Sequence, residues 1–474
     1  MKLIVIGGGP AGVMAALRGR ELGAEVSLLE RNCLGGIGIN DGVAPLRTLA
    51  RTARLIRDSG AWATFGLYGP KPTLDFPAAL ANARRVSSYA HEQKNVEKFV
   101  RDRGVEVIDH AGQARFVDNR TVLLPDGRRF RADRFIIAVG GRARKLPIPG
   151  HELGLSHADL WTLKALPARV TVVGAAATGC QIASIFRDFG AEVDLIEAAP
   201  RINSQADEDV SAALSTAFQE RGIQVRTGCV TELLETTSLG FKVTYRREGQ
   251  TDSLFTGAVF FAVGWAGNID SLELDAAGIA TERGYVAVNE YLQTNVPHIY
   301  AVGDVNGQSM LVPSAAHEGL LAAENAVLGP RLKYSRRIVS SGSFTDPEYA
   351  SVGLTESQAR AAHDCAVALV RYDILTRAVV DARTEGFCKL IADRESGLIL
   401  GAHVVGEYSA EVIQVVAACM AGGLTVDQVS DLQLAYPTFT QAIGLAAQRL
   451  IREMGRVATA TVWNSTEERH VAVG

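Results

Sequence analysis

Two glycine-containing segments have the residue types and spacing needed to bind a pyrophosphate. In the first, Gly7 allows a tight turn, Gly9 lets the backbone approach phosphate oxygens, and Gly12 lets a helix pack closely on a strand. The N–H groups at the start of that helix would donate hydrogen bonds to the phosphates. Glu30 follows at the spacing of an acid that accepts hydrogen bonds from a ribose. This pattern predicts a dinucleotide site.

The pattern recurs later, at Gly174, Ala176 and Gly179, and is followed by Glu197. Ala176 occupies the position of the middle glycine, and its methyl group should displace a pyrophosphate slightly outward. The recurrence predicts two bound dinucleotides. The alternative is a second unit of the same fold that no longer binds a ligand.

Short apolar runs and helical segments must position these residues. Around the first site we expect a strand over 2–6, a helix over 13–22 and a strand over 25–29. Around the second site we expect the same series over 169–173, 180–189 and 192–196. Each series is a strand–turn–helix–strand unit of a parallel α/β sheet.

The composition excludes other classes of protein. The 474 residues suggest about two to four domains. Hydrophobic residues make up 47%, which is too much for a disordered chain. The net charge of −4 gives no basis for binding nucleic acid. The apolar N-terminal run is interrupted at Gly7–Pro10, and no run is long enough to span a membrane, so we expect a cytoplasmic protein.

The cysteines occur singly, without the close pairs typical of zinc sites or redox motifs. We therefore expect no metal site and no disulfide framework. Each cysteine should be a small buried hydrophobic residue. The six are Cys33, Cys180, Cys229, Cys365, Cys388 and Cys419.

Longer segments indicate a family. Residues 135–144 (FIIAVGGRAR) and 259–268 (VFFAVGWAGN) resemble the links between two nucleotide domains, and 294–304 (TNVPHIYAVGD) resembles a second FAD motif. Residues 344–356 (FTDPEYASVGLTE) and 386–406 (GFCKLIADRESGLILGAHVVG) resemble an interface domain. From residue 1 to about 452, the chain thus resembles the pyridine-nucleotide disulfide reductases, in the branch of dihydrolipoamide dehydrogenase and mercuric reductase.

This resemblance implies an α/β fold with two Rossmann-like domains, for FAD and NAD(P), and a C-terminal α+β dimerisation domain. We expect the FAD-binding domain over 1–150 and 269–335, and the NAD(P)-binding domain over 151–268. The dimerisation domain should span 336–474, with apolar helices over 410–420 and 440–451 and a C-terminal tail from 453. The resemblance also implies that the protein is a homodimer.

The resemblance also assigns cofactor-binding residues. At the FAD it places Gly7, Gly9, Pro10, Ala11, Gly12, Glu30, Arg31, Gly36, Ala138, Gly140 and Asp304, the last holding the ribityl chain. At the NAD(P)H it places Gly174, Ala176, Thr178, Gly179, Gln181, Glu197 and Gly264. The carboxylate of Glu197 would repel a 2′-phosphate, which favours NADH, although Arg201 could partly offset this repulsion.

The sequence departs from the family where the family does thiol chemistry. The relatives carry GGTCLNxGCIPSK, whereas residues 35–47 read GGIGINDGVAPLR, with Gly38 and Val43 at the two cysteine positions. The relatives' HPTxxE reads YPTFTQ, so Tyr436 replaces the acid–base histidine and Gln441 the glutamate that orients it. A dithiol relay needs two sulfurs, a proton acceptor and an orienting group. The sequence therefore predicts that this relay is absent.

What remains is hydride transfer from NADH to FAD, followed by direct transfer to a small acceptor such as a quinone. The candidate catalytic residues are Arg47, at the position of the motif's lysine, and Tyr436 and Gln441, which the resemblance places in the second subunit. Simpler roles are that Tyr436 fills the space left by the histidine and that Arg47 pairs with Asp41. Two other functions stay open: a reaction on a specific metabolite, and a flavin-bound subunit without activity.

Overall fold

Apolar pentapeptides at the start of the chain form the centre of a parallel sheet. β1 (Lys2–Ile6) and β2 (Glu25–Leu29) are largely buried and pair with each other in parallel. β7 (Arg134–Ile137) pairs with the other edge of β1. The five-stranded sheet has the order β19-β7-β1-β2-β3, completed by β19 (Ile299–Ala301) and β3 (Glu106–Ile108). The strands predicted over 2–6 and 25–29 are confirmed.

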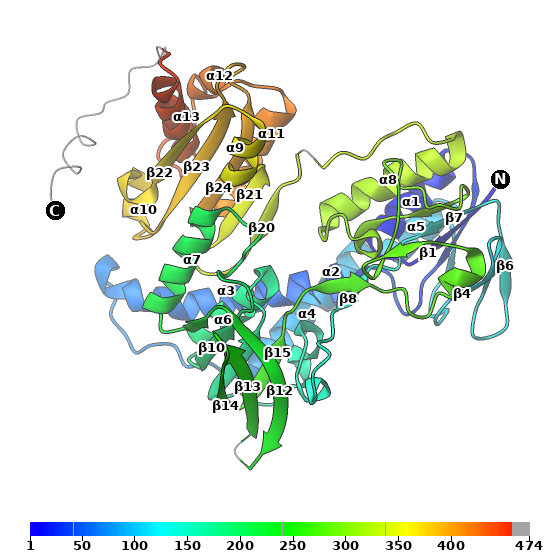
Figure 1. Ribbon diagram of the computed structural model, residues 1–474, viewed down its shortest axis with the longest axis horizontal. Coiled ribbons are helices and arrows are strands. Elements are labelled where there is room, and N and C mark those ends of the chain that lie inside the picture. Colours follow the sequence, from blue (N-terminus) through cyan, green and yellow to red (C-terminus); the bar gives the residue numbers. More distant parts are fainter. Residues whose placement is uncertain (41, 239, 337, 457–474) are drawn as a thin grey trace. The chain divides into compact units, whose positions relative to one another are not determined.

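Two helices pack against each other at this sheet, α1 (Pro10–Glu21) and α8 (Val312–Leu328) (Figure 1). A Cβ on Gly319 of α8 would lie 2.1 Å from the Ala11 carbonyl oxygen, so glycine is required for this close approach. α1 begins three residues earlier than predicted. The reason is that Pro10, whose fixed φ suits the first helical turn, starts the helix inside the glycine motif.

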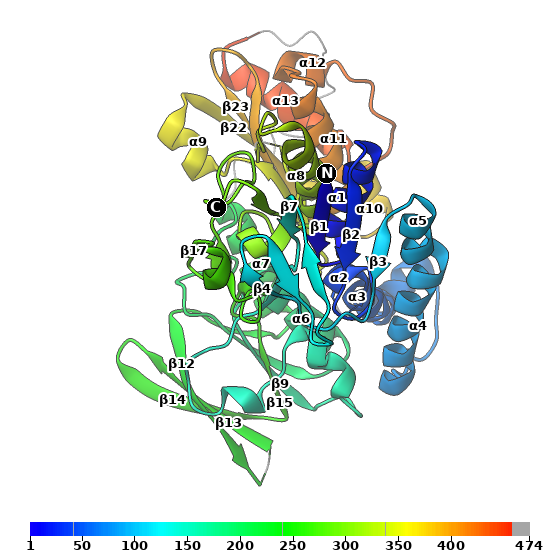
Figure 2. The same ribbon diagram turned by 90° about the vertical axis from the view of Figure 1, so that its right-hand side faces the viewer.

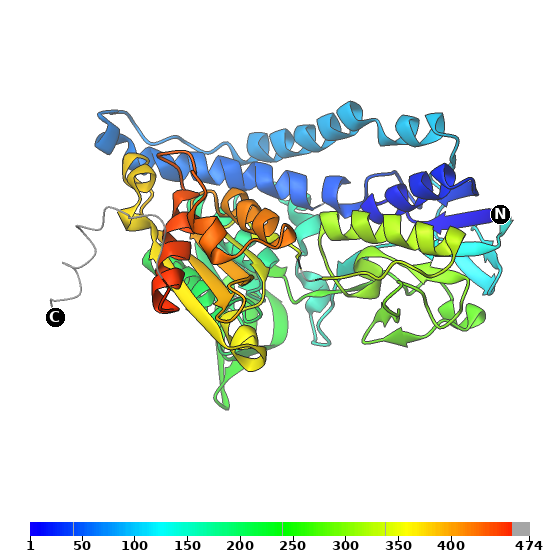
Figure 3. The same ribbon diagram turned by 90° about the horizontal axis from the view of Figure 1, so that it is seen from above.

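Two long helices follow the first strand–helix–strand unit. The short α2 (Gly36–Asn40) leads into α3 (Val43–Asp58), and α3 packs side by side with α4 (Phe76–Lys94) (Figure 3). α3 buries Leu46, Leu49 and Ala53.

A second parallel sheet repeats the first unit. It has the order β11-β10-β9-β15, and it is built from β9 (Arg169–Val173), β10 (Glu192–Ile196), β11 (Gln224–Arg226) and β15 (Ala258–Phe261). α6 (Ala177–Asp188) connects β9 to β10. An antiparallel sheet follows β11 (Figure 2), formed by β12 (Cys229–Thr237), β13 (Gly240–Arg247) and β14 (Gln250–Thr256).

Shorter elements complete this part of the chain. They are η1 (Ser59–Phe65), α5 (Val96–Asp102), β4 (Arg115–Asp118), β5 (Thr121–Leu123), β6 (Arg129–Arg131), β8 (Gly141–Ala143), η2 (His151–Leu153), η3 (His157–Thr162), β16 (Trp265–Gly267), η4 (Leu274–Ala277), β17 (Thr281–Glu282), β18 (Tyr285–Val286) and η5 (Gly303–Asn306).

The computed structural model describes residues 1–40, 42–238, 240–336 and 338–456. The chain divides into an N-terminal unit, Met1–Pro200 with Arg221–Arg336, and a C-terminal unit, Arg201–Glu220 with Arg337–Gly474. One helix of the segment expected to bind NAD(P), 151–268, therefore belongs to the C-terminal unit; this helix is α7 (Glu208–Glu220).

The C-terminal unit contains a five-stranded antiparallel sheet in the order β20-β21-β24-β23-β22. Its strands are β20 (Ser341–Ser343), β21 (Tyr349–Gly353), β22 (Cys365–Arg371), β23 (Gly386–Asp393) and β24 (Ile399–Gly406). Its helices besides α7 are α9 (Glu356–Ala362), η6 (Tyr372–Ile374), α10 (Thr376–Val380), α11 (Ser409–Ala421), α12 (Val426–Ser430) and α13 (Gln441–Glu453).

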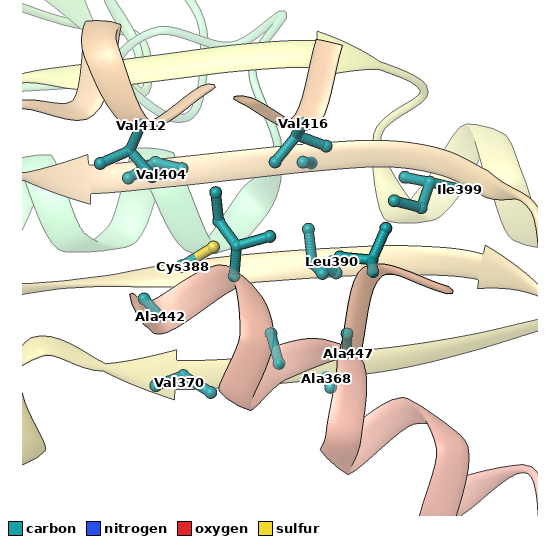
Figure 4. Packing of buried hydrophobic residues seen from close by; sticks show 14 of the residues in the cluster. Ala368, Val370, Cys388, Leu390, Ile399, Val404, Val412, Val416, Ala442 and Ala447 are labelled. Carbon is teal, nitrogen blue, oxygen red and sulfur yellow. The ribbon is translucent and has the colours of Figure 1, made fainter. Parts of the chain in front are cut away.

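Alternation along the strands of this sheet separates an apolar face from a polar one. Cys388 and Leu390 of β23 and Val404 of β24 belong to the apolar core that α11 and α13 cover (Figure 4). Lys389 lies between Cys388 and Leu390, and His403 immediately precedes Val404, so the side chains of Lys389 and His403 point to the opposite face of the sheet. α11 and α13 are the two apolar helices predicted over 410–420 and 440–451. Among the described residues, no helix has the length and apolar character to cross a membrane.

Candidate functional site

The turn from β1 to α1 has a backbone that tolerates only glycine at two positions. Gly7 has a φ of +109°, and a Cβ there would lie 2.3 Å from the Ala138 carbonyl oxygen. A Cβ on Gly12 would lie 1.8 Å from the Gly7 carbonyl oxygen. Gly9 is different, since its Cβ would meet only the Cα of Gly36, at 3.7 Å. The protein alone therefore leaves room at Gly9, where a pyrophosphate requires it.

The start of α1 offers hydrogen-bond donors at this turn. Gly9 is the N-cap and provides no side-chain cap, and Pro10 occupies the first turn. The remaining N–H groups of the first turn are oriented along the helix axis, where an anion is stabilised. Ala11 and Gly12 are buried beneath them.

Glu30 lies where β2 ends and is held firmly by the backbone. Its Oε2 accepts a hydrogen bond from the Gly8 N–H at 2.6 Å, and its Oε1 accepts one from the Asn32 N–H at 2.8 Å. A carboxylate oxygen can accept more than one hydrogen bond, so lone pairs remain for ribose hydroxyls. Arg31, the next residue, is exposed.

The second glycine turn reproduces this geometry. Gly174 has a φ of +97°, and a Cβ on Gly179 would lie 1.8 Å from the Gly174 carbonyl oxygen. Glu197 accepts hydrogen bonds from the Ala175 N–H at 2.7 Å and the Ala199 N–H at 2.8 Å, as Glu30 does from its own neighbours. Ala176 is the N-cap of α6, again without a side-chain cap. The repeat in the sequence is thus a repeat in space.

The other residues predicted to bind FAD gather around the first turn. A Cβ on Gly36 would lie 2.9 Å from the Cα of Gly9, so these two backbones touch. Ala138 is buried at the end of β7, and Gly140 follows it with a φ of +72°. Asp304, in η5, is partly buried, and this burial raises the pKa of its carboxyl to about 6. A Cβ on Gly141 would lie 3.1 Å from the Cβ of Asp304.

The other residues predicted to bind NAD(P)H belong to α6 and to the segment after β15. Thr178 and Gln181 lie half-buried in the first turns of α6. Gly264 follows β15, is exposed and has a φ of +99°. Arg201 lies in the C-terminal unit, where its Nη1 donates a hydrogen bond to the Ala206 carbonyl at 3.1 Å.

The three candidate catalytic residues fall in different units. Arg47 is exposed on the first turns of α3, in the N-terminal unit. Tyr436 and Gln441 belong to the C-terminal unit. The Tyr436 side chain is 68% exposed, and its hydroxyl lies 2.9 Å from the Thr376 Oγ1. Asp41, the proposed partner of Arg47, and the tail after 456 lie outside the described residues.

The cysteines do not replace the missing pair. Five are buried as expected, but Cys33 is exposed, so the expectation was wrong there; it lies in the surface segment after β2. The Cys180 thiol donates a hydrogen bond to the Ala175 carbonyl at 3.2 Å, and burial raises its pKa far above the usual range. Within the described ranges, no group of three or more His, Cys, Asp or Glu side chains is placed to hold a metal ion.

The sequence interpretation missed one buried acid near the FAD residues. Glu318 of α8 is fully buried and contacts η5, which carries Asp304. Its signal in the sequence is weak, because it is one of two acids, with Glu324, in a largely apolar helical stretch, and such an acid is normally placed on the exposed face.

Comparisons with known proteins show the family to which the chain belongs. Residues 1–319 match the family described as pyridine nucleotide-disulphide oxidoreductase, and residues 339–447 match its dimerisation domain. The chain is 34% identical over 459 residues to a dihydrolipoyl dehydrogenase of Zymomonas mobilis, covering 93% of this chain and 96% of that protein. It is 31% identical over 460 residues to a mercuric reductase of Lysinibacillus sphaericus, covering 96% and 84%.

Solved structures show the same fold. LpdA from Mycobacterium tuberculosis matches with a TM-score of 0.86 and 25% identity, over 95% of this chain and 99% of that chain. The HOCl-induced flavoprotein disulfide reductase RclA from Escherichia coli matches with a TM-score of 0.82 and 26% identity, over 94% and 99%.

Proposed function

Because the chain belongs to the pyridine nucleotide-disulphide oxidoreductase family, we propose that it is an NADH-oxidising flavoenzyme that reduces a small acceptor directly, without a cysteine relay. As in the family, the fold combines FAD- and NAD-binding domains with a dimerisation domain, and the cofactors are FAD and NAD(P)H. The direct route to the acceptor is the new element of this proposal.

One observation supports the direct route to the acceptor. The resemblance places two redox cysteines within α2 and at the start of α3, where this chain has Gly38 and Val43. Cys33 and Cys180 do not form a reactive thiol pair, because Cys33 is exposed after β2 whereas Cys180 is buried with a strongly raised pKa. A dithiol that exchanges with a disulfide substrate therefore has no sulfur with which to begin.

The residues that we propose as cofactor ligands lie at both glycine turns. The turn at Gly7–Gly12 and the start of α1 would hold the FAD pyrophosphate, Glu30 its ribose and Asp304 its ribityl chain. The turn at 174–179 and Glu197 would hold NADH. When bound, FAD supplies two-electron chemistry between NADH and an acceptor.

A quinone is the acceptor class that this chemistry favours. The reaction NADH + H⁺ + quinone → NAD⁺ + hydroquinone balances and needs no thiol. It requires a site that stabilises negative charge on a quinone oxygen and delivers protons. Arg47 would supply the positive charge, and the Tyr436 hydroxyl would donate a proton or hydrogen bond.

Stopped-flow kinetics on variants test these roles. Arg47→Ala and Tyr436→Phe should leave flavin reduction by NADH within a few-fold of the parent, yet slow reoxidation by a quinone by about 10²-fold. Arg51→Ala is the matched control, because Arg51 is exposed one turn further along α3. Parent reoxidation rates in both variants with every quinone tried would exclude this acceptor site.

Substrate screening tests the missing relay. Lipoamide, glutathione disulfide and mercuric ion should give no appreciable NADH-dependent turnover, whereas quinones should. Turnover of any of these three at rates comparable to a quinone would contradict the proposal. Failure of NADH to bleach the flavin would instead favour a subunit without activity.

We also propose a homodimer, built through the dimerisation domain at residues 339–447. The segment that Tyr436 contacts exposes large apolar side chains: Ile374 is 46% exposed, and Val379 and Val380 are each 58% exposed. Such a patch on one chain favours burial against a second copy. Light scattering should give twice the chain mass at micromolar concentration, and a monomer mass would contradict this proposal.

A further inference from the structure

A buried acid in α8 has no role in the proposed reaction. Glu318 is fully buried, and its neighbours on the same face of α8 are mainly small residues such as Ala315 and Ala322. Burial of a carboxyl without compensation is unfavourable, so its hydrogen-bond partners should explain its presence.

These partners flank Asp304. The Oε2 of Glu318 accepts hydrogen bonds from the Gly303 N–H and from the Asn306 Nδ2, each at 2.7 Å. Gly303 and Asn306 are the first and last residues of η5. Asn306 in turn accepts a hydrogen bond from the Gln308 N–H at 2.9 Å, which ties the next residues to the same turn. Glu318 thus forms hydrogen bonds with both ends of the turn that carries Asp304.

The electrostatics of this cluster agree with a close coupling. Burial, the largest effect, and the charge of Asp304 raise the pKa of Glu318, whereas hydrogen bonds from Gly303 and Asn306 lower it, and the net result is a pKa of about 7. The second oxygen of Glu318, Oε1, is buried and, among the described residues, has no hydrogen-bond partner; the same holds for the hydroxyl oxygens of Ser314 and Tyr334. The two hydrogen bonds of this carboxyl at 2.7 Å are both directed at η5.

We propose that Glu318 is a positioning residue for FAD, which holds the turn Gly303–Asn306 so that Asp304 faces the cofactor. The inference rests on the FAD site of the proposed function but not on the identity of the acceptor. The alternative is that Glu318 only supports the packing of α8, and this alternative predicts no coupling between Glu318 and Asp304.

Titration of apoprotein with FAD, followed by flavin fluorescence, measures the proposed role. Glu318→Ala should raise the Kd for FAD by about 10-fold or more, because two short hydrogen bonds to the turn are lost. Glu318→Gln should raise it less, because the amide oxygen can accept both bonds. Glu324→Gln is the control: it lies on the same helix, but its carboxylate pairs at the surface with Arg18 at 2.7 Å and Arg331 at 2.9 Å.

A double-mutant cycle with Asp304→Asn separates the two alternatives. If Glu318 acts through Asp304, then Glu318→Ala should change the Kd only slightly in the Asp304→Asn background. An undiminished effect there would overturn the inference, and so would parent-like FAD affinity of Glu318→Ala. If Glu318→Ala does not fold, the same cycle with Glu318→Gln decides.

The test also distinguishes this inference from the proposed function. An unchanged Kd for FAD in Asp304→Asn would refute the link between Glu318 and the cofactor. It would leave quinone reduction by the parent protein, and its dependence on Arg47, unaffected. Conversely, a parent protein that reduces no quinone can still show the coupling between Glu318 and Asp304.

Discussion

Replacement of Lys389 by Met should strongly destabilise the C-terminal unit. The Lys389 Nζ lies 2.8 Å from Asp207, 2.6 Å from Asp209 and 2.6 Å from Glu356. Its side chain is 2% exposed, and that of Asp207 is 1% exposed. The cluster joins β23 to the starts of α7 and α9, so Lys389→Met removes the cation that contacts all three carboxylates. Glu356 then keeps Arg360 at 2.7 Å, and buried Asp207 keeps, among the basic side chains of the described residues, only His403, at 3.7 Å.

The magnitude follows from the exposure of the three acids. Loss of one partner of a buried ion pair typically costs about 3–5 kcal/mol. Asp209 and Glu356 are 49% and 29% exposed, so water can solvate them, and only Asp207 is left fully buried. We therefore expect a loss near the lower end, about 3 kcal/mol at pH 7. Lys389→Met with Asp207→Asn should recover part of it, because no unpaired buried charge remains.

The loss should depend on pH in a stated direction. Burial opposes ionisation of Asp207, but hydrogen bonds from the Glu356 N–H and Lys389 outweigh it and hold its pKa below the usual value. A lowered carboxyl pKa stabilises the fold above the unfolded pKa of about 4 and loses this contribution as pH falls through the folded pKa. In Lys389→Met the carboxylates lose their cation, so the difference from the parent should shrink below about pH 4.

Urea unfolding followed by far-UV circular dichroism at several pH values measures both effects. Arg371→Met is the control, because Arg371 pairs with Asp373 at the surface of the same unit and its side chain is 71% exposed. Its midpoint should match that of the parent. A loss of under about 1 kcal/mol at pH 7 in Lys389→Met, the range of an exposed pair, would refute the reasoning, as would a loss that does not change with pH.

Two further predictions concern the nucleotide sites. Gly12→Ala should lower the thermal midpoint of the apoprotein, because its Cβ would lie 1.8 Å from the Gly7 carbonyl oxygen. Gly9→Ala should leave this midpoint unchanged, because its Cβ would meet the protein no closer than 3.7 Å, and it should weaken only FAD binding. Equal FAD affinity in Gly9→Ala and parent would contradict this assignment. NADH should reduce the flavin more efficiently than NADPH, and Glu197→Gln should narrow the difference, because the carboxylate repels a 2′-phosphate; a parent protein without preference would refute this role of Glu197.

The strands and turns around the nucleotides could be predicted because their residues leave little freedom. Each strand that flanks the glycine turns is a mostly apolar pentapeptide whose pattern fits a buried parallel strand, and the structure places all four as expected. The helix starts were less well predicted, because the periodic pattern begins only after the first turn. Pro10 and Ala177 lie inside the glycine motifs and are already helical.

Other features depend on contacts that are distant in sequence. Glu318 binds η5, and Lys389 meets Asp207 from a separate part of the chain, so neither role is visible in local spacing. α7, which follows Asp207, belongs to the same C-terminal unit as Lys389. A lone buried acid or lysine is uncommon enough that the pattern alone favours the surface. Only the folded partners explain these charges.

The loss of thiols need not disturb the nucleotide sites, because different parts of the backbone build the two functions. The glycine turns depend on β1, β9 and the helices that follow them. The segment that lacks cysteines keeps its own framework: Gly36 has a φ of +63° against Gly9, and the Gly42 N–H donates a hydrogen bond to the Ile37 carbonyl at 2.8 Å before α3 begins. Gly38 lies in α2, next to Ile37, and Val43 is the first residue of α3, next to Gly42. Cofactor binding and the route to the acceptor can therefore change independently, which is the separation that the Arg47 and Tyr436 variants would measure.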